Sequence, residues 1–203
     1  TKILIASTLV PPQTGGAEKI AWEHARLLSQ NPNYEVHLLT CTHRPKYIKN
    51  VHFHILPRTL LPTIYFATIG RLQIRKMLRK HSFDIIHCHM SLPWGYVFKN
   101  AHAKKIITFH GCEYLNKDIF FRHFAKEACK NASALISPSK WLSFYVQKQF
   151  GYQSMVIPNG IETSKYRISS ANSVDESRIL AQNGKPEKKI VLFVGRLIEM
   201  KGI

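Results

Sequence analysis

The sequence is poor in acidic residues and in cysteine, and it contains no long apolar run. Only 12 residues are Asp or Glu, against 29 Lys and Arg, so the 203-residue chain carries a formal net charge of +17. Such a surface attracts nucleic acid, anionic lipid or phosphorylated small molecules, and the sign alone does not choose among them. No segment reaches the roughly 18 apolar residues of a membrane span. The four cysteines form no C-x-x-C pair, which favours reduced thiols in a cytoplasmic protein.

Two common nucleotide-binding motifs are also missing. The chain has no G-x-x-x-x-G-K-[ST] segment, which argues against a P-loop. It has no G-x-G-x-x-G after its first apolar run, which argues against a dinucleotide-dependent dehydrogenase.

What the sequence does contain is a regular alternation of apolar runs and helical patterns. This alternation predicts an α/β fold with a Rossmann-like, doubly wound parallel sheet. We expect helices near 17–30, 64–81, 93–101, 117–131 and 139–150. We expect strands near 2–8, 35–41, 51–55, 84–88, 104–109, 133–137 and 154–157.

The composition changes towards the end of the chain. Residues 1–165 are predicted to form one domain, and the polar stretch 166–188 a linker. Within 189–203, Ile190 to Val194 are continuously apolar, as in a strand covered on both faces. We therefore expect 189–203 to begin a second domain, so that this chain supplies one wall of a cleft between two domains.

Gly15 and Gly16 follow the first predicted strand and open a helix. Because they lack side chains, backbone N–H groups can approach a ligand closely there, and the helix N-terminus favours a phosphate. Glu18 lies in the first turn of the same helix. A plain turn with two glycines is the alternative.

Three histidines end predicted strands. Alternation places His87 and His89 on one face of the fourth strand, with Cys88 on the other, and His110 follows the fifth strand. Since the carboxyl ends of strands face the ligand crevice in an open α/β sheet, these imidazoles can bind a sugar or a phosphate. Packing histidines and a zinc site are the alternatives; the spacing matches no standard structural zinc site, so no metal is expected.

A basic helix is predicted over 64–81. Arg71, Arg75 and Arg79 recur every four residues and form one stripe, to which Lys76 and Lys80 add charge. Such a helix can lie on an anionic membrane surface, or it can be a solvated surface helix. Near the end of the chain, Arg196 and Lys201 offer a bidentate fork and a point charge that suit a diphosphate.

Six short motifs, in this order and spacing, resemble the GT-B glycosyltransferases, specifically the retaining family 4 (glycosyl transferases group 1). They are Gly15–Glu18 (GGAE), Asp84–His89 (DIIHCH), Thr108–Gly111 (TFHG), Ser133–Ser139 (SALISPS), Val156–Ile161 (VIPNGI) and Val194–Gly202 (VGRLIEMKG). The resemblance implies two Rossmann-like domains with the active site between them. The first, represented by this chain, would mainly bind the acceptor, and the second would mainly bind the nucleotide-sugar donor.

By this resemblance, His110 would be catalytic and hydrogen-bond the transferred sugar. Gly15, Gly16, Arg196 and Lys201 would contact the donor's diphosphate. Glu18, His87 and His89 are assigned to the acceptor or crevice, and Pro158–Gly160 to an interdomain hinge. The basic helix is similar to the membrane-docking helix of some members, which implies a protein peripheral to the inner face of a membrane.

The implied reaction moves a sugar from a nucleoside diphosphate to an acceptor hydroxyl, in glycan or cell-envelope biosynthesis such as that of lipopolysaccharide. It retains the anomeric configuration and needs no cofactor. The paired glutamates of the family lie beyond Ile203, so the isolated fragment is expected to be inactive. One alternative is a non-catalytic Rossmann-like module that binds anions or nucleic acid, although no nucleic-acid partner is expected. A nucleotide-sugar epimerase is another, which Glu18, Glu113 and Asp118 leave open.

Overall fold

The computed structural model describes residues 1–13, 15–58, 69–111, 118–166 and 193–194, and the chain divides into two units, Thr1–Asn159 and Gly160–Ile203. The first unit contains the whole described sheet. The predicted linker 166–188 and the predicted strand at 190–194 lie almost entirely outside the described residues. Phe193 and Val194 are described, and both are exposed. The predicted boundary at residue 165 therefore stays a prediction.

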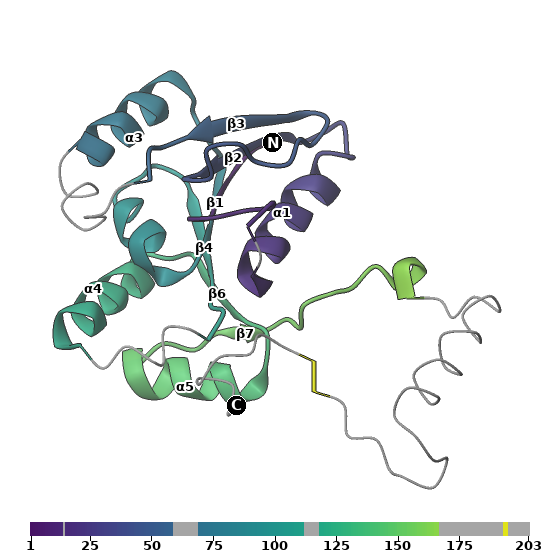
Figure 1. Cartoon of the computed structure of the whole chain (residues 1–203). Helices are drawn as coiled ribbons and strands as arrows, with labels where there is room; N and C mark the ends of the chain where they lie inside the picture. The colour runs from purple at the N-terminus through teal and green to yellow at the C-terminus, as the bar shows by residue number, and fades with distance from the viewer. Residues whose placement is uncertain (14, 59–68, 112–117, 167–192, 195–203) are drawn as a thin grey trace, which may run out of the picture. The chain divides into compact units, whose positions relative to one another are not determined.

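The first unit is built on a seven-stranded sheet in which every strand pair is parallel (Figure 1). Its strand order is β3-β2-β1-β4-β5-β6-β7. The strands are β1 (Lys2–Ala6), β2 (Glu35–Thr40), β3 (Val51–Ile55), β4 (Ile85–His89), β5 (Lys104–Thr108), β6 (Ala134–Ser137) and β7 (Met155–Val156). This order confirms the Rossmann-like doubly wound sheet.

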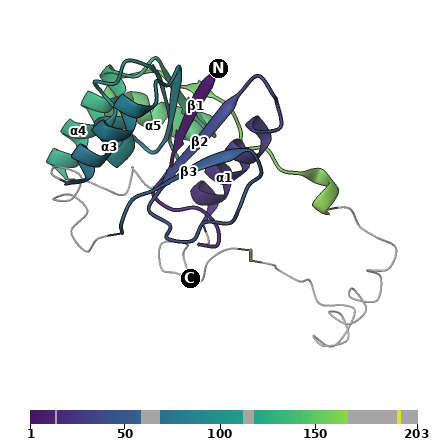
Figure 2. The ribbon, with the colours of Figure 1, turned by 90° about the horizontal axis from the view of Figure 1, so that it is seen from above.

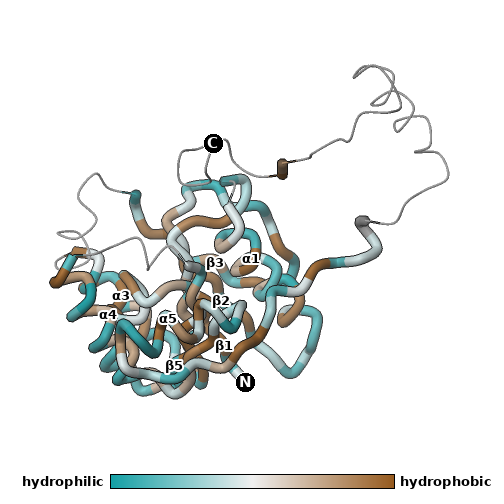
Figure 3. Tube along the Cα trace, turned by 90° about the horizontal axis from the view of Figure 1, so that it is seen from below, coloured by the Kyte–Doolittle hydropathy of each residue, from teal (hydrophilic) through white to brown (hydrophobic). Residues whose placement is uncertain are grey.

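Helices cover both faces of the sheet. Helix α1 (Gly16–Leu28) packs on one face, and α3 (Ile69–Lys80), α4 (Ile119–Lys130) and α5 (Lys140–Phe150) pack on the other (Figure 2). Each strand of the buried centre must therefore be apolar on both sides. In β1, Ile3 and Ile5 join the core under α1, and Leu4 and Ala6 join the core on the opposite face. Figure 3 shows hydrophobic residues, in brown, along the strands in the middle of this unit.

The helix ends follow from local side chains. Asp118 accepts hydrogen bonds from the backbone N–H groups of Phe120 (2.7 Å) and Phe121 (3.0 Å) at the start of α4. Ser139 caps α5 in the same way through Leu142 N–H (3.2 Å), and Gly151 ends that helix with a φ of +80°. The predicted helix 64–81 is described only from Ile69 onward.

The helix predicted over 93–101 is wrong in extent and type. A five-residue π-helical segment, η1 (Ser91–Gly95), is followed by two α-helical residues at 96–97 and then by turns. Pro93 disfavours a helical conformation at the residue before it, and Leu92 is extended (φ −125°, ψ 142°). Gly95 packs so tightly that a Cβ there would lie 2.8 Å from Ile107 Cδ1.

The three described cysteines, Cys41, Cys88 and Cys129, are buried free thiols, as the spacing predicted. Within the described part of the chain, no helix is both long and apolar enough to cross a membrane.

A cluster of histidines lies at the β2–β3 edge of the sheet. The buried His37 shares hydrogen bonds with His54 Nε2 (2.7 Å, from His37 Nδ1) and with Glu35 Oε1 (2.9 Å, from His37 Nε2). The ring of His81 lies 5.1 Å from that of His37. Burial lowers the pKa of His37, and it lowers the pKa of His54 to about 4, with a smaller effect from the neighbouring histidines.

This cluster predicts a loss of stability on acidification. In the unfolded chain His54 takes up a proton near its ordinary pKa of 6.5, whereas in the folded chain it stays neutral until about pH 4. The unfolded state therefore binds more protons between these values, and stability falls as the pH falls through that window. Between pH 7 and pH 5 we expect His54 to contribute about 1–2 kcal/mol to this loss. Urea unfolding of the wild type and of His54→Gln at several pH values between 7 and 5 measures this change in unfolding free energy. Equal pH slopes for the two proteins would contradict the prediction.

Candidate active site

The candidate site lies where the winding direction of the sheet changes. β1 pairs with β2 on one side and with β4 on the other, and the chain runs outward from β1 in both directions. Ligands of open α/β sheets bind outside the carboxyl ends of the strands at such a switch point. The loop from β1 to α1 and the end of β4 meet there.

The loop from β1 to α1 is held by hydrogen bonds to its neighbours. Trp94 Nε1 donates to Thr8 Oγ1 (3.1 Å), and Val10 N–H donates to Thr42 Oγ1 (2.9 Å). At the end of this loop Gly15 is the N-cap of α1 and Gly16 its first residue, as predicted. Glu18 lies in the first turn. The arrangement places the N-terminus of α1 at the end of this loop, with the Glu18 carboxylate lying against Gly15.

Four imidazoles stack beside this loop, and together we call them the histidine cluster: His24, His87, His89 and His110. Ring centroids of His87 and His89 lie 4.6 Å apart, and those of His89 and His110 lie 5.1 Å apart. His24 lies 5.5 Å from His87 and 5.2 Å from His89. As alternation along β4 predicted, Cys88 points to the other face and packs in the core there.

Two hydrogen bonds fix the orientation of these rings. His87 Nε2 shares one with the hydroxyl of Thr108 (2.7 Å), at the end of β5. His89 Nδ1 shares another with His110 Nε2 (2.9 Å). These bonds connect the ends of β4 and β5 through side chains.

The histidine cluster is uncharged at neutral pH. Burial, with a smaller effect from neighbouring histidines, lowers the pKa of His87 to about 3 and that of His110 to about 4. Burial also places the pKa of His89 well below its ordinary value and lowers that of His24. A neutral imidazole carries one N–H donor and one acceptor nitrogen. The cluster can therefore position hydroxyl groups, but it brings no charge to neutralise a diphosphate.

Unusual backbone angles follow two of the histidines. Met90, directly after His89, has a φ of +85°, which is uncommon for a residue with a side chain. Gly111, directly after His110, has a φ of +92°. This positive backbone angle by itself requires glycine at position 111. Sparsely populated angles of this kind gather at functional sites.

The sequence reasoning missed His24 and Thr108. His24 is three residues after the buried Ala21 and four before Leu28, which packs on the core, so helical spacing places it on the side of α1 that faces the sheet. That signal was available. Thr108 ends a strand as any β-branched residue can, and only the pairing of β4 with β5 places it against His87.

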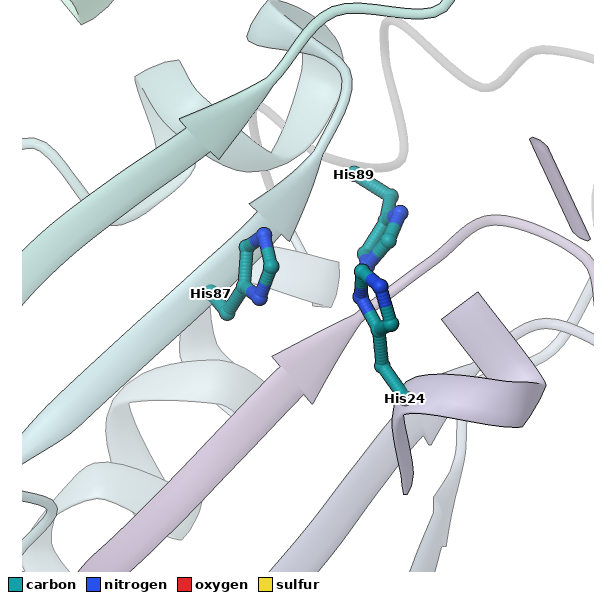
Figure 4. Close-up of side chains that lie close together, drawn as sticks. All are labelled: His24, His87 and His89. Carbon is teal, nitrogen blue, oxygen red and sulfur yellow. The ribbon is translucent and has the colours of Figure 1, made fainter. Parts of the chain in front are cut away.

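The structure brings some of the predicted residues together and leaves others apart. His24 of α1 packs against His89 of β4 (Figure 4). His89 in turn is hydrogen-bonded to His110. The cations Arg71, Arg75, Lys76, Arg79 and Lys80 are all exposed on α3, which covers the face opposite α1. Arg196 and Lys201 lie outside the described residues.

The doubly wound parallel sheet with a polar switch point is the architecture of the Rossmann-like domains in GT-B glycosyltransferases. Residues 14–165 match the profile of Glycosyltransferase Family 4, and the chain belongs to this family. The chain is 26% identical over 185 residues to TuaC of Bacillus subtilis (strain 168), a glycosyltransferase that its name assigns to teichuronic acid biosynthesis. That match covers 85% of this chain and 44% of TuaC. An uncharacterized glycosyltransferase of Methanocaldococcus jannaschii is 25% identical over 232 residues, which cover all of this chain and 57% of that protein.

Solved structures show the same fold. Sucrose-phosphate synthase from Thermosynechococcus elongatus superposes with a TM-score of 0.74 at 19% identity, over 99% of this chain and 57% of that one. A glycosyltransferase from Rickettsia africae gives a TM-score of 0.66 at 16% identity, over 91% of this chain and 50% of that one. The chain spans about half the length of the curated relatives it matches, 44% and 57%.

The bond between His87 and Thr108 predicts a specific loss in a Thr108 variant. Thr108→Val keeps the shape but leaves the buried His87 Nε2 without its partner, which costs about 1–3 kcal/mol of unfolding free energy. Thr108→Ser is the matched control, because it retains the hydroxyl. Urea unfolding at pH 7 measures both variants, and NMR of the His87 ring reports its tautomer. If Thr108→Val is as stable as the wild type and its His87 tautomer is unchanged, the Thr108 hydroxyl does not hold the His87 ring through this hydrogen bond.

Proposed function

We propose that the chain forms the acceptor-side domain of a retaining glycosyltransferase. In this reaction a sugar moves from a nucleoside diphosphate to an acceptor hydroxyl, with glycan or cell-envelope assembly as the pathway. The observation that carries the proposal is the neutral histidine cluster, which α1, β4 and the end of β5 bring together at the switch point of a Family 4 domain. Hydroxyl-rich ligands suit neutral imidazoles, and a diphosphate suits a helix N-terminus.

Different residues of the chain would have different roles in the transfer. His110 would hydrogen-bond the transferred sugar, and His87 and His89 would form the polar floor beneath it. The N–H groups at Gly15 and Gly16 would face the departing diphosphate, on which negative charge grows in the transition state. Arg196 and Lys201, on the donor side, would add fixed positive charge there. Among the residues that the structure describes we see no internal nucleophile, so we propose same-face attack, with the leaving phosphate accepting the acceptor's proton.

His110→Ala tests this assignment in the enzyme that carries both domains. We expect kcat/KM for sugar transfer to fall about 100-fold or more, as when a positioned donor to the reacting group is lost. The change also removes the partner of His89, so unfolding free energy should fall by about 1–3 kcal/mol. A panel of nucleoside-diphosphate sugars identifies the donor, and product NMR gives the anomeric configuration.

The control for this variant is His102→Ala, which changes an exposed histidine outside the cluster. It should transfer sugar at the wild-type rate. If His110→Ala also keeps the wild-type rate, His110 has no part in the reaction. If the two-domain enzyme transfers no sugar from any donor, the proposed activity itself is wrong.

We also propose that α3 contacts an anionic membrane surface. Its five cations Arg71, Arg75, Lys76, Arg79 and Lys80 are exposed, and so are its apolar residues Ile69 (61%) and Leu72 (65%). Ile74 and Met77 hold the other side of the helix on the core. Exposed cations with neighbouring apolar groups are what an interfacial helix needs.

Replacing three arginines of α3 should weaken vesicle binding. Near an anionic surface each cation contributes about 1 kcal/mol, so Arg71→Gln/Arg75→Gln/Arg79→Gln should lower the partition coefficient about 100-fold. Co-sedimentation with vesicles containing phosphatidylserine measures the effect. The charge-matched control is Arg44→Gln/Lys49→Gln/Lys148→Gln, at exposed positions outside α3. Equal losses in both triple variants would mean that only net charge matters.

A further inference from the structure

Three members of the histidine cluster form a compact set of nitrogen atoms. His24 projects from α1, and His87 and His89 project from the same face of β4, so that their rings point toward one another (Figure 4). One ring nitrogen from each lies within 4.8 Å of the corresponding atoms of the other two. We call these three residues the histidine trio. They come from segments about 60 residues apart in the sequence.

Two nitrogens of the trio are buried without a hydrogen-bond partner. They are Nδ1 of His24 and Nε2 of His89, the latter on a side chain that is only 1% exposed. Buried polar atoms are nearly always paired, so an orphaned pair in one place requires an explanation. A ligand between the rings supplies one.

Two of the other four ring nitrogens are held from outside. His87 Nε2 is bonded to Thr108 Oγ1, and His89 Nδ1 to His110 Nε2. This leaves Nδ1 of His87 and Nε2 of His89 as the atoms available to the trio. Histidines that bind metals are oriented in this way, with the second nitrogen hydrogen-bonded to an outer partner.

We propose that His24, His87 and His89 bind one divalent transition-metal ion of the zinc class. Imidazole nitrogens suit zinc, copper and nickel, whereas calcium and magnesium require oxygen ligands, and the trio has none. Zinc–nitrogen bonds of about 2.0–2.1 Å at tetrahedral angles place ligand nitrogens about 3.4 Å apart. The present limit of 4.8 Å is somewhat wider, and rotation about the broad χ2 torsions of histidine can reduce it.

A bound ion requires the three imidazoles in their neutral form, with their lone pairs available. Three protein ligands leave the fourth position of a tetrahedral ion open to water or to an oxygen of a ligand in the crevice. Cys88 cannot contribute, because its thiol lies in the core on the other face of the sheet. The site differs from the zinc site weighed from the sequence, because His24 replaces the cysteines.

A second group of possible ligands lies at the β2–β3 edge, and it provides an internal comparison. Glu35, His37 and His52 also bring their ligand atoms within 4.8 Å of one another. There, however, both nitrogens of His37 already have hydrogen-bond partners, and Glu35 is paired with Lys2 at 2.9 Å. An ion at that edge would have to break these bonds. The trio has no such competition at His24 Nδ1 and His89 Nε2.

Zinc and cobalt titrations of the chain, after treatment with a chelator, test the proposal without any sugar-transfer assay. Calorimetry should show one Zn²⁺ bound per chain, and Co²⁺ should produce visible absorption bands of a tetrahedral nitrogen site. Mg²⁺ should not compete. His24→Gln and His89→Gln should each weaken Zn²⁺ binding at least 100-fold. The comparison variant His52→Gln should bind like wild type.

NMR of the histidine rings in the wild-type protein tests the same site without a substitution. It can therefore be used even if a variant of the histidine trio fails to fold. One equivalent of Zn²⁺ should shift the ring signals of His24, His87 and His89 and leave those of His52 and His123 in place. The proposal fails if no saturable binding occurs, or if His52→Gln is the variant that removes it. These experiments measure metal binding and not sugar transfer. A chain that binds no Zn²⁺ would therefore leave the proposed glycosyl transfer open, and an enzyme that transfers no sugar would leave the proposed metal site open.

Discussion

The fold and the candidate site both depend on the pairing of β1 with two neighbours. β2 lies on one side of β1 and β4 on the other, in parallel registers that bury every residue of Leu4–Ala6 completely. Fully burying one aliphatic side chain contributes about 1.5–3 kcal/mol, so the centre of the sheet is strongly favoured. Because crossovers in parallel sheets are right-handed, growth in opposite directions from β1 places α1 on one face and the later helices on the other. The crevice at the end of β1 and β4 is a consequence of that reversal.

Polar side chains are concentrated at this reversal because backbone pairing ends there. β4 ends at His89 and β5 at Thr108, and beyond these residues side chains must satisfy one another. They do so through the bonds of His87 to Thr108 and of His89 to His110. The positive φ angles at Met90 and Gly111 turn the chain away directly afterwards. The result is a group of hydrogen-bonded polar side chains at the ends of β4 and β5, against which His24 of α1 packs.

The exposed cations of α3 lie away from the histidine cluster. The cations of α3 lie on the helical face opposite α1, whereas the histidine cluster is neutral. A positive surface and a neutral binding floor serve different ligands, since charge attracts an anionic surface over a distance and imidazoles select hydroxyl groups at contact. This separation agrees with membership of a glycosyltransferase family.

Much of this arrangement could be predicted from the amino-acid sequence by itself. Apolar runs indicated the central strands, because burial on both faces leaves little room for polar residues, whereas the edge strands β3 and β7 have no buried residue. Strand alternation placed His87 and His89 on one face, and Gly15–Gly16 marked the start of α1. The helix expected over 93–101 was only partly right, because helical backbone ends at residue 97 and turns follow, and the apolar pattern of this stretch does not determine where a helix ends. Only the tertiary structure decided that His24 meets the end of β4 and that Thr108 meets His87, since strand order, and not sequence distance, determines which segments become neighbours.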